Sequence, residues 1–158
     1  MANDGITIKG LTELKAKLAS LSDKEGDACI RKALKAGAAI EQAAIEERAP
    51  VKDTTGGQLP PGALKADIGV NIRKSKLGNL YAVVGPGKFT AHVARWVEYG
   101  HRIVRGGRLR KGGKHTGNVP EHPFIRPAYE QTRDEVATTI ATTLADEIEK
   151  ASAKKGTS

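Results

Sequence analysis

The feature that most constrains this chain is the segment 96–129, where an aromatic cluster, a glycine-rich cationic stretch and a proline-braced helix start follow one another. No acidic side chain interrupts the stretch between Gly100 and Pro120. Its basic residues are Arg102, Arg105, Arg108, Arg110, Lys111 and Lys114. Unpartnered cations would lose their hydration on burial, so this stretch must project toward water or toward an anionic partner. We therefore take these residues as candidates for contact with DNA or with an acidic protein surface.

Aromatic residues flank the basic stretch and predict a small core that fixes both of its ends. They are Trp96, Tyr99, Phe124 and Tyr129. The same frame is expected to include Glu98, Gly100, Pro123, Arg126 and Pro127. Glu98 stands at the end of a predicted helix, where we expect it to orient the chain or to pair with Arg95 or Arg102. Pro127 suits the first residue of a helix.

Hydrophobic periodicity predicts the main helices. Leucines spaced by three and four residues indicate a short amphipathic helix over 11–21. A longer helix is expected over about 27–49, because Pro50 stops it, and its small residues at 36–39 permit close approach of another element. The last helix is expected from Pro127 to about Ala151, with apolar residues recurring at every fourth position.

Alternating polarity predicts strands over 68–72 and 80–86, and a third is expected over 101–104 after a short helix over 90–99. The predicted fold class is α+β. An antiparallel sheet of three to four strands would pack against a long N-terminal helix and a long C-terminal helix, with extended loops. We expect a single domain over 1–150, mobile loops at 50–64 and 101–118, and a frayed basic tail at 151–158.

Composition bounds the class of protein. The net charge is +8, and most of the surplus lies in the basic stretch and near the C-terminus, which favours an anionic partner. A lone Cys29 excludes an internal disulfide and is expected to fill a small apolar space. No stretch approaches the ~20 apolar residues of a membrane span, so a soluble intracellular protein is expected.

Motifs that carry chemistry are missing from the sequence. The four histidines lack metal-ligand spacing; they are His92, His101, His115 and His122. Carboxylates that a metal-dependent nuclease would cluster are scattered, at Asp53, Asp67, Glu98 and Glu121. The GPGK sequence at 85–88 lacks the spacing of a nucleotide-binding loop. We predict no enzymatic activity, no metal and no cofactor.

The order of several motifs resembles that of the small neck proteins of long-tailed bacteriophages, a tail-component or tail-completion family at the head–tail junction. Between about residues 5 and 150 the motifs are GLTELKAKLASL, IRKALKAGAAIEQAAIEERAP, ADIGVNI, YAVVGP, ARWVEYG and PEHPFIRPAYE. The pair WVEYG and PFIRPA is the most distinctive. Two departures from the family pattern are the extra LPPG before Leu64 and the long cationic loop after Gly100.

The resemblance implies a non-catalytic α+β subunit of the virion, assembled in the cytoplasm of the bacterial host. It implies a homo-oligomeric ring that contacts two neighbouring neck rings, the head-closure protein and the tail terminator. DNA runs along the axis of such rings, so the basic loop would touch phosphates or dock on an acidic neighbouring ring.

A different class of function stays open. The chain is alternatively a sequence-independent nucleic-acid-binding module that acts through the basic loop at 102–114. Such a module would bind random duplex as an isolated protein, with a steep dependence on salt.

Overall fold

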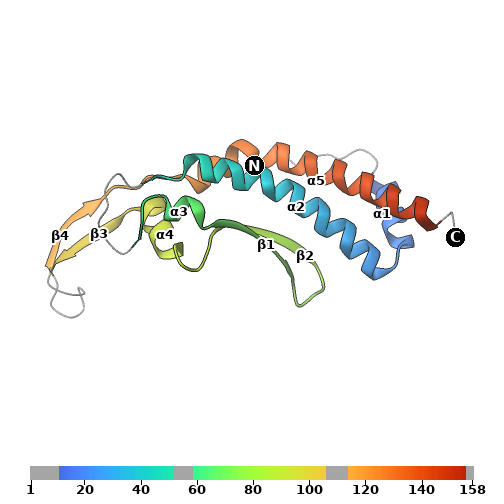
Figure 1. Cartoon of the computed structure of the whole chain (residues 1–158), viewed down its shortest axis with the longest axis horizontal. Coiled ribbons are helices and arrows are strands. Elements are labelled where there is room, and N and C mark those ends of the chain that lie inside the picture. The colour runs from blue at the N-terminus through green and yellow to red at the C-terminus, as the bar shows by residue number, and fades with distance from the viewer. Residues whose placement is uncertain (1–10, 52–58, 106–113, 156–158) are drawn as a thin grey trace, which may run out of the picture. The chain divides into compact units, whose positions relative to one another are not determined.

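The computed structural model describes residues 11–51, 59–105 and 114–155 (Figure 1). In chain order its elements are α1 (Leu11–Ser20), α2 (Asp23–Arg48), α3 (Ala63–Ala66), β1 (Ile68–Lys74), β2 (Leu80–Pro86), α4 (Ala91–Tyr99), β3 (His101–Arg105), β4 (Lys114–Val119) and α5 (Ile125–Lys155). The α+β class and the two long helices are confirmed. No helix in these ranges is long and apolar enough to cross a membrane.

The described residues group into two compact units. Unit 1 contains residues 11–43, 70–84 and 131–155, and unit 2 contains residues 44–51, 59–69, 85–105 and 114–130. The prediction of a single domain stays a prediction, and each unit is described by itself below.

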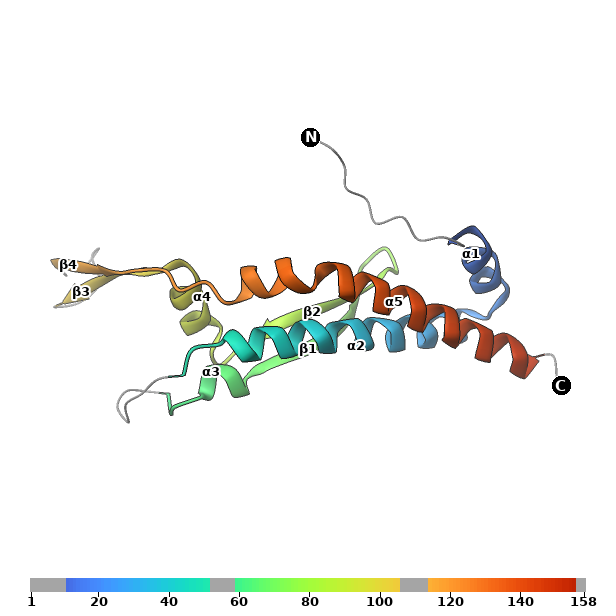
Figure 2. The ribbon, with the colours of Figure 1, turned by 90° about the horizontal axis from the view of Figure 1, so that it is seen from above.

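In unit 1, α2 and α5 lie side by side (Figure 2). A small core joins Leu21, Cys29 and Ile148, and partly buried apolar residues of α1 and α5 pack against it. Cys29 is buried there, as expected, and its thiol donates to the backbone oxygen of Glu147 at 3.5 Å. The free thiol therefore acts as a packed side chain with one weak hydrogen bond.

Close approach of α2 and α5 depends on Gly37. A Cβ atom at this position would lie 2.5 Å from Cγ1 and 2.9 Å from Cδ1 of Ile140, and 3.2 Å from Cγ1 of Val136. The first two distances are too short for carbon atoms, so a side chain here would force the helices or Ile140 to move. The sequence prediction that small residues at 36–39 permit close approach is confirmed at this position.

Replacing Gly37 by alanine is therefore expected to destabilise the protein by about 1–2 kcal/mol. Alanine favours the helix by up to ~1 kcal/mol, but overpacking a tight contact costs about 1–3 kcal/mol. Urea unfolding would measure the change. Gly26→Ala in the same helix is the matched control, because its Cβ would meet Leu18 at an ordinary 3.6 Å. We expect that variant to be neutral or stabilised, and equal effects at the two positions would contradict the packing argument.

The strands form two separate hairpins, β1–β2 and β3–β4, rather than one sheet of three to four strands. Each pair is antiparallel and forms a sheet of two strands, and α4 lies in the connection between β2 and β3. The turn of the first hairpin is tight, with the Ser75 amide donating to the Asn79 oxygen at 2.8 Å and Gly78 at a φ of 88°. In the second, the register pairs His101 with Val119 and contains a bulge after Ile103.

Some element bounds differ from the expectation. Residues 114–118 of the expected loop at 101–118 belong to β4, and residues 63–64 of the expected loop at 50–64 belong to the short α3. Helix α5 begins at Ile125, two residues before the expected start at Pro127, and continues to Lys155, past the expected end near Ala151. Pro127 stands in the first turn, where a missing amide hydrogen costs no intrahelical bond.

The expected aromatic core is wrong for three of its four members. Phe124 is fully buried, but Trp96 is 48%, Tyr99 64% and Tyr129 56% exposed. Residues three and four apart share one face of a helix, and α4 turns Ala94 and Glu98 inward, so Trp96 and Tyr99 lie on its outer side. The interior that the sequence assigned to four aromatic rings therefore contains Phe124 with the small Ala94 and the capping Glu98.

Candidate functional site

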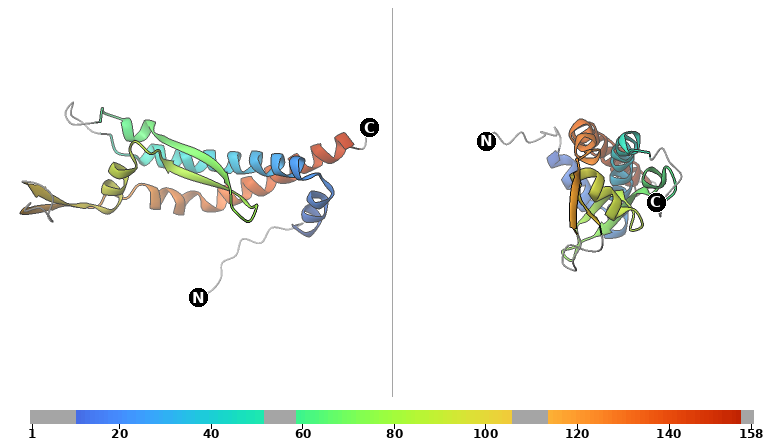
Figure 3. Two further views of the ribbon diagram at one scale, coloured as in Figure 1. Left: turned by 90° about the horizontal axis from the view of Figure 1, so that it is seen from below. Right: turned by 90° about the vertical axis from the view of Figure 1, so that its left-hand side faces the viewer.

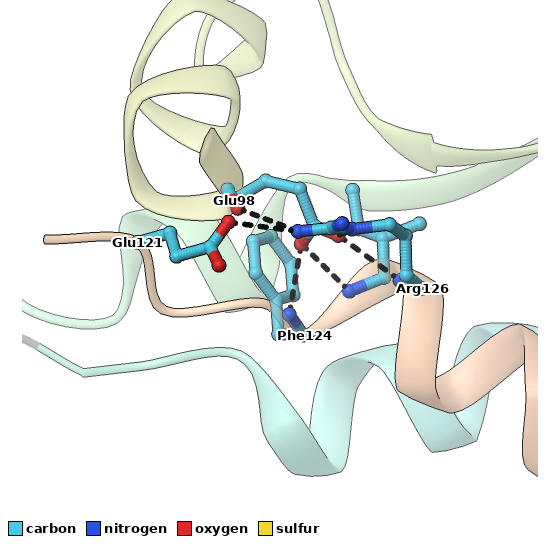
Figure 4. A network of polar contacts seen from close by, with 5 residues as sticks. Glu98, Glu121, Phe124 and Arg126 are labelled. Carbon is cyan, nitrogen blue, oxygen red and sulfur yellow. Dashed lines mark hydrogen bonds and ion pairs between the residues drawn. The ribbon is translucent and has the colours of Figure 1, made fainter. Parts of the chain in front are cut away.

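A buried carboxylate organises the region between α4 and α5 in unit 2 (Figure 4). Glu98 is 2% exposed and accepts backbone N–H bonds from Phe124 at 2.8 Å, Ile125 at 3.0 Å and Arg126 at 3.1 Å. The Nε–H of Arg126 donates a hydrogen bond to Glu98 Oε1 at 3.0 Å. Its Nη2 donates to the Glu98 backbone oxygen at 3.3 Å and to Glu121 Oε2 at 3.1 Å. Glu98 thus caps the first turn of α5 from another helix, where a negative charge is favourable.

This arrangement corrects the expected partner of Glu98. The carboxylate pairs with Arg126 of α5, which is 28 positions away, and not with Arg95 or Arg102. Arg95 lies on the same helix as Glu98 and Arg102 lies on β3, and both are exposed. Three free amides at the start of α5 and the Arg126 guanidinium together supply the donors to the Glu98 carboxylate.

Two effects oppose each other in the pKa of Glu98. Burial would raise it, but the amide donors of Ile125, Phe124 and Arg126 and the Arg126 guanidinium outweigh burial and lower the pKa below its ordinary value of 4.5. The folded chain therefore binds fewer protons at this site than the unfolded chain. Ionised Glu98 stabilises the fold above the unfolded pKa, and this stabilisation is lost as pH falls through the lowered folded pKa.

We expect the stability difference between the wild type and Glu98→Gln to depend on pH. The difference should be constant at neutral pH and should shrink as the pH falls below about 4.5. Protonation then removes the negative charge of Glu98, and the wild type becomes similar to the uncharged glutamine variant. Urea unfolding of both proteins at several pH values from neutral to acidic would measure it. A gap that stays unchanged down to acid denaturation would contradict an ionised Glu98.

The β3–β4 hairpin extends from the end of α4 (Figure 3). Its two ends are held by backbone contacts. Gly100 leads into β3 with a φ of 67°, and a Cβ atom there would lie 2.6 Å from the Val119 oxygen. After β4, the His122 amide donates to the Val97 oxygen at 2.8 Å. Glycine is required at position 100 for both its backbone conformation and its close contact.

The start of α4 is held by a second carboxylate. Asp67 Oδ2 accepts the Thr90 amide at 3.0 Å and the Thr90 hydroxyl at 2.8 Å, and Thr90 is fully buried. The Gly87 amide donates to the Asp67 backbone oxygen at 2.8 Å. Sequence reasoning weighed Asp67 only as a scattered carboxylate and missed this contact, because no local motif signals a partner 23 positions away.

The part of the chain that contains Glu98 matches a known protein family. Residues 12–100 match the family model described as "Bacteriophage HK97-gp10, putative tail-component", over more than half of the chain. The chain belongs to the HK97-gp10-like family. No curated protein and no solved structure matches the sequence significantly.

Membership in the HK97-gp10-like family makes the chain a bacteriophage tail component and confirms the family resemblance. The matched residues extend from within α1 to Gly100, so they include WVEYG and Glu98. The segment PFIRPA, the β3–β4 hairpin and α5 lie outside them. The capping carboxylate therefore belongs to the family frame, while the amides that it caps follow the matched region.

The basic residues lie partly on the hairpin. Arg102, Arg105 and Lys114 stand on β3 and β4 and are exposed, and none of them forms an ion pair with another described residue. Arg105 and Lys114 are directly opposite each other in the register. Like charges at such a position are destabilising. The other candidates, Arg108, Arg110 and Lys111, lie outside the described residues.

The rings on the outer side of α4 contact one another and their neighbours. Trp96 meets His92 edge-on with centroids 5.3 Å apart, and lies 5.4 Å from the His101 ring at an interplanar angle of 33°. The Arg126 guanidinium lies 5.2 Å from the centre of the Tyr99 ring. In the described ranges no three His, Cys, Asp or Glu side chains are placed to hold a metal.

Two hollows adjoin α4 on different sides. An apolar one of about 290 Å³ is lined by Val93 and Val97 of α4 and by residues of α3 and the preceding loop, including Leu59 and Pro60 of the extra LPPG sequence. An open one of about 530 Å³ is lined by Arg95, Trp96, Tyr99 and Gly100. The second hollow lies on the exposed aromatic side of the helix.

Proposed function

We propose that this tail component is a structural subunit of the phage neck that joins DNA-filled heads to tails. The family match carries the proposal, because it places the chain among proteins of the tail. In this proposal several copies form a ring that contacts the head-closure ring on one side and the tail terminator on the other. Subunits made in the host cytoplasm would then be incorporated into the virion.

The exposure of aromatic side chains supports assembly with other subunits. Of the six aromatic residues, Phe124 is buried and the other five are each more than 40% exposed. The exposed ones are Tyr81, Phe89, Trp96, Tyr99 and Tyr129. Aromatic residues are enriched at protein interfaces, where they gain burial that the isolated chain does not provide. A subunit that completes its packing in a ring has this distribution.

The basic hairpin supports contact with an anionic neighbour. The opposed Arg105 and Lys114 repel each other in the isolated chain, and an anion placed between them would relieve that repulsion. In a neck ring the anion is a DNA phosphate in the lumen or an acidic group of an adjacent ring. Arg108, Arg110 and Lys111 would add to the same contact.

The test is electron microscopy of lysates in which this gene alone is deleted. We expect DNA-filled heads and separate tails, with joined particles restored when the intact gene is supplied in trans. Intact infectious particles from the deletion would overturn the neck function. Binding of the purified protein to random duplex across a salt series would then test the alternative nucleic-acid-binding module.

A further inference from the structure

The outer side of α4 presents a compact set of side chains that the capping network leaves exposed. Residues three and four apart lie on one face of a helix, and Arg95, Trp96 and Tyr99 are all exposed and line one hollow. We call these three residues the α4 face. The opposite side of the helix carries the buried Ala94 and Glu98, so the α4 face lies on the outside of unit 2.

The rings of the α4 face are held in place before any partner arrives. Trp96 is fixed between His92 and His101, and Tyr99 lies under the guanidinium of Arg126. That guanidinium is itself fixed by Glu98 and by Glu121. Rigid aromatic side chains lose little conformational entropy on binding, which favours their use as anchors in an interface.

Charge indicates the chemistry of the partner. Arg95 forms no ion pair with a described residue, and the same holds for Arg102 and Arg105 on the adjoining strand. The carboxylates of this region, Glu98 and Glu121, are already bonded to Arg126. A second copy of a chain with a net charge of +8 would bring more positive charge to this surface.

The exposed rings favour a protein over DNA. The tilted His101 ring already contacts Trp96, and the Arg126 guanidinium lies over Tyr99, so these rings are less available for the base stacking that single strands require. The phosphates of a duplex offer nothing apolar to Ile103 and Val119, which are each 38% exposed on the hairpin. Tryptophan, tyrosine and arginine together are the residues that dominate protein–protein binding energy.

We infer that the α4 face docks on an acidic protein surface of a different virion component, with Arg95 pairing with a carboxylate and Trp96 and Tyr99 packing against apolar groups around it. The inference rests on the proposed neck function and names the surface by which the subunit engages a neighbouring ring. The β3–β4 hairpin would extend the contact through Arg102 and Arg105.

The test uses free heads and free tails purified from the deletion lysate, titrated with the labelled full-length protein. Trp96→Ala and Arg95→Glu are each expected to weaken binding to one of the two particles by about 30-fold or more, the loss typical of an interface anchor. Leu77→Ala and Lys76→Glu are matched controls, because Leu77 is an exposed apolar side chain and Lys76 an exposed cation, both in unit 1. Both controls should bind like the wild type.

The outcomes separate this inference from the neck function. Wild-type binding and normal rescue of joined particles by Trp96→Ala and Arg95→Glu would overturn the α4 face while leaving the neck function intact. Unchanged binding to particles, together with weaker binding of both variants to a random 30-bp duplex, would overturn the choice of a protein partner. A deletion that assembles normally would overturn the neck function itself, before any variant is made. Melting curves of each variant confirm that the folds compared are the same.

Discussion

Replacing Glu98 by alanine is expected to lower the free energy of unfolding by about 3–5 kcal/mol. The change removes the acceptor of three backbone amides and leaves the Arg126 guanidinium without its buried partner. Buried donors that lose their acceptor cost their full desolvation energy, which exceeds the net value of an ordinary hydrogen bond. Urea unfolding followed by circular dichroism would measure the loss.

Glu121 provides the control, since it bonds the same arginine from an exposed position. Glu121→Ala is expected to cost less than about 1 kcal/mol, because exposed ion pairs contribute little. Similar losses at the two positions would mean that the salt bridge to Arg126, rather than the capping of α5, accounts for the stabilisation.

Replacing Phe124 by alanine is expected to cost about 3–5 kcal/mol as well. Its ring is fully buried in unit 2, and truncation removes the buried surface and leaves a cavity that the structure fills incompletely. The backbone amide that reaches Glu98 is unchanged by this substitution, so the loss reports packing. The same urea unfolding experiment applies.

Phe89→Ala tests whether burial, and not residue type, determines that loss. Phe89 is 70% exposed, and we expect a change within about 0.5 kcal/mol. A large effect at Phe89 would show that the isolated chain buries this ring, which would weaken the argument that the aromatic residues serve contacts between subunits.

The helices could be predicted from the sequence because their signals are local. Leucine and isoleucine spacings give the periods of α1, α2 and α5, Pro50 limits α2, and Gly100 ends α4. The small residues around Gly37 likewise indicated a close helix contact, which Ile140 supplies. Alternating polarity located β1 and β2, but the pattern of a strand does not specify its neighbour, so the separation into two hairpins was not foreseen.

The organisation of the site could not be predicted, because it depends on residues that are distant in sequence. Hydrophobicity alone assigned Trp96 and Tyr99 to the core. These two residues are three positions apart, so they share one face of α4, and that face is the outer one. The useful signal was the spacing of Ala94 and Glu98, a small residue and a carboxylate on one face. Even so, nothing near Glu98 in the sequence indicates that its partners are the amides of residues 124–126.

The two fixed ends of the β3–β4 hairpin have an evolutionary consequence. Gly100 and the Val97–His122 hydrogen bond hold the chain where the hairpin leaves and returns, and Glu98 fixes the residues that follow. Lengthening a loop between fixed ends costs little, about 0.6 kcal/mol for each doubling. The hairpin can thus change in length and in charge at little cost to the residues that hold its two ends. A tail component that met a different neighbour through this hairpin would need to change only the residues between these anchor points.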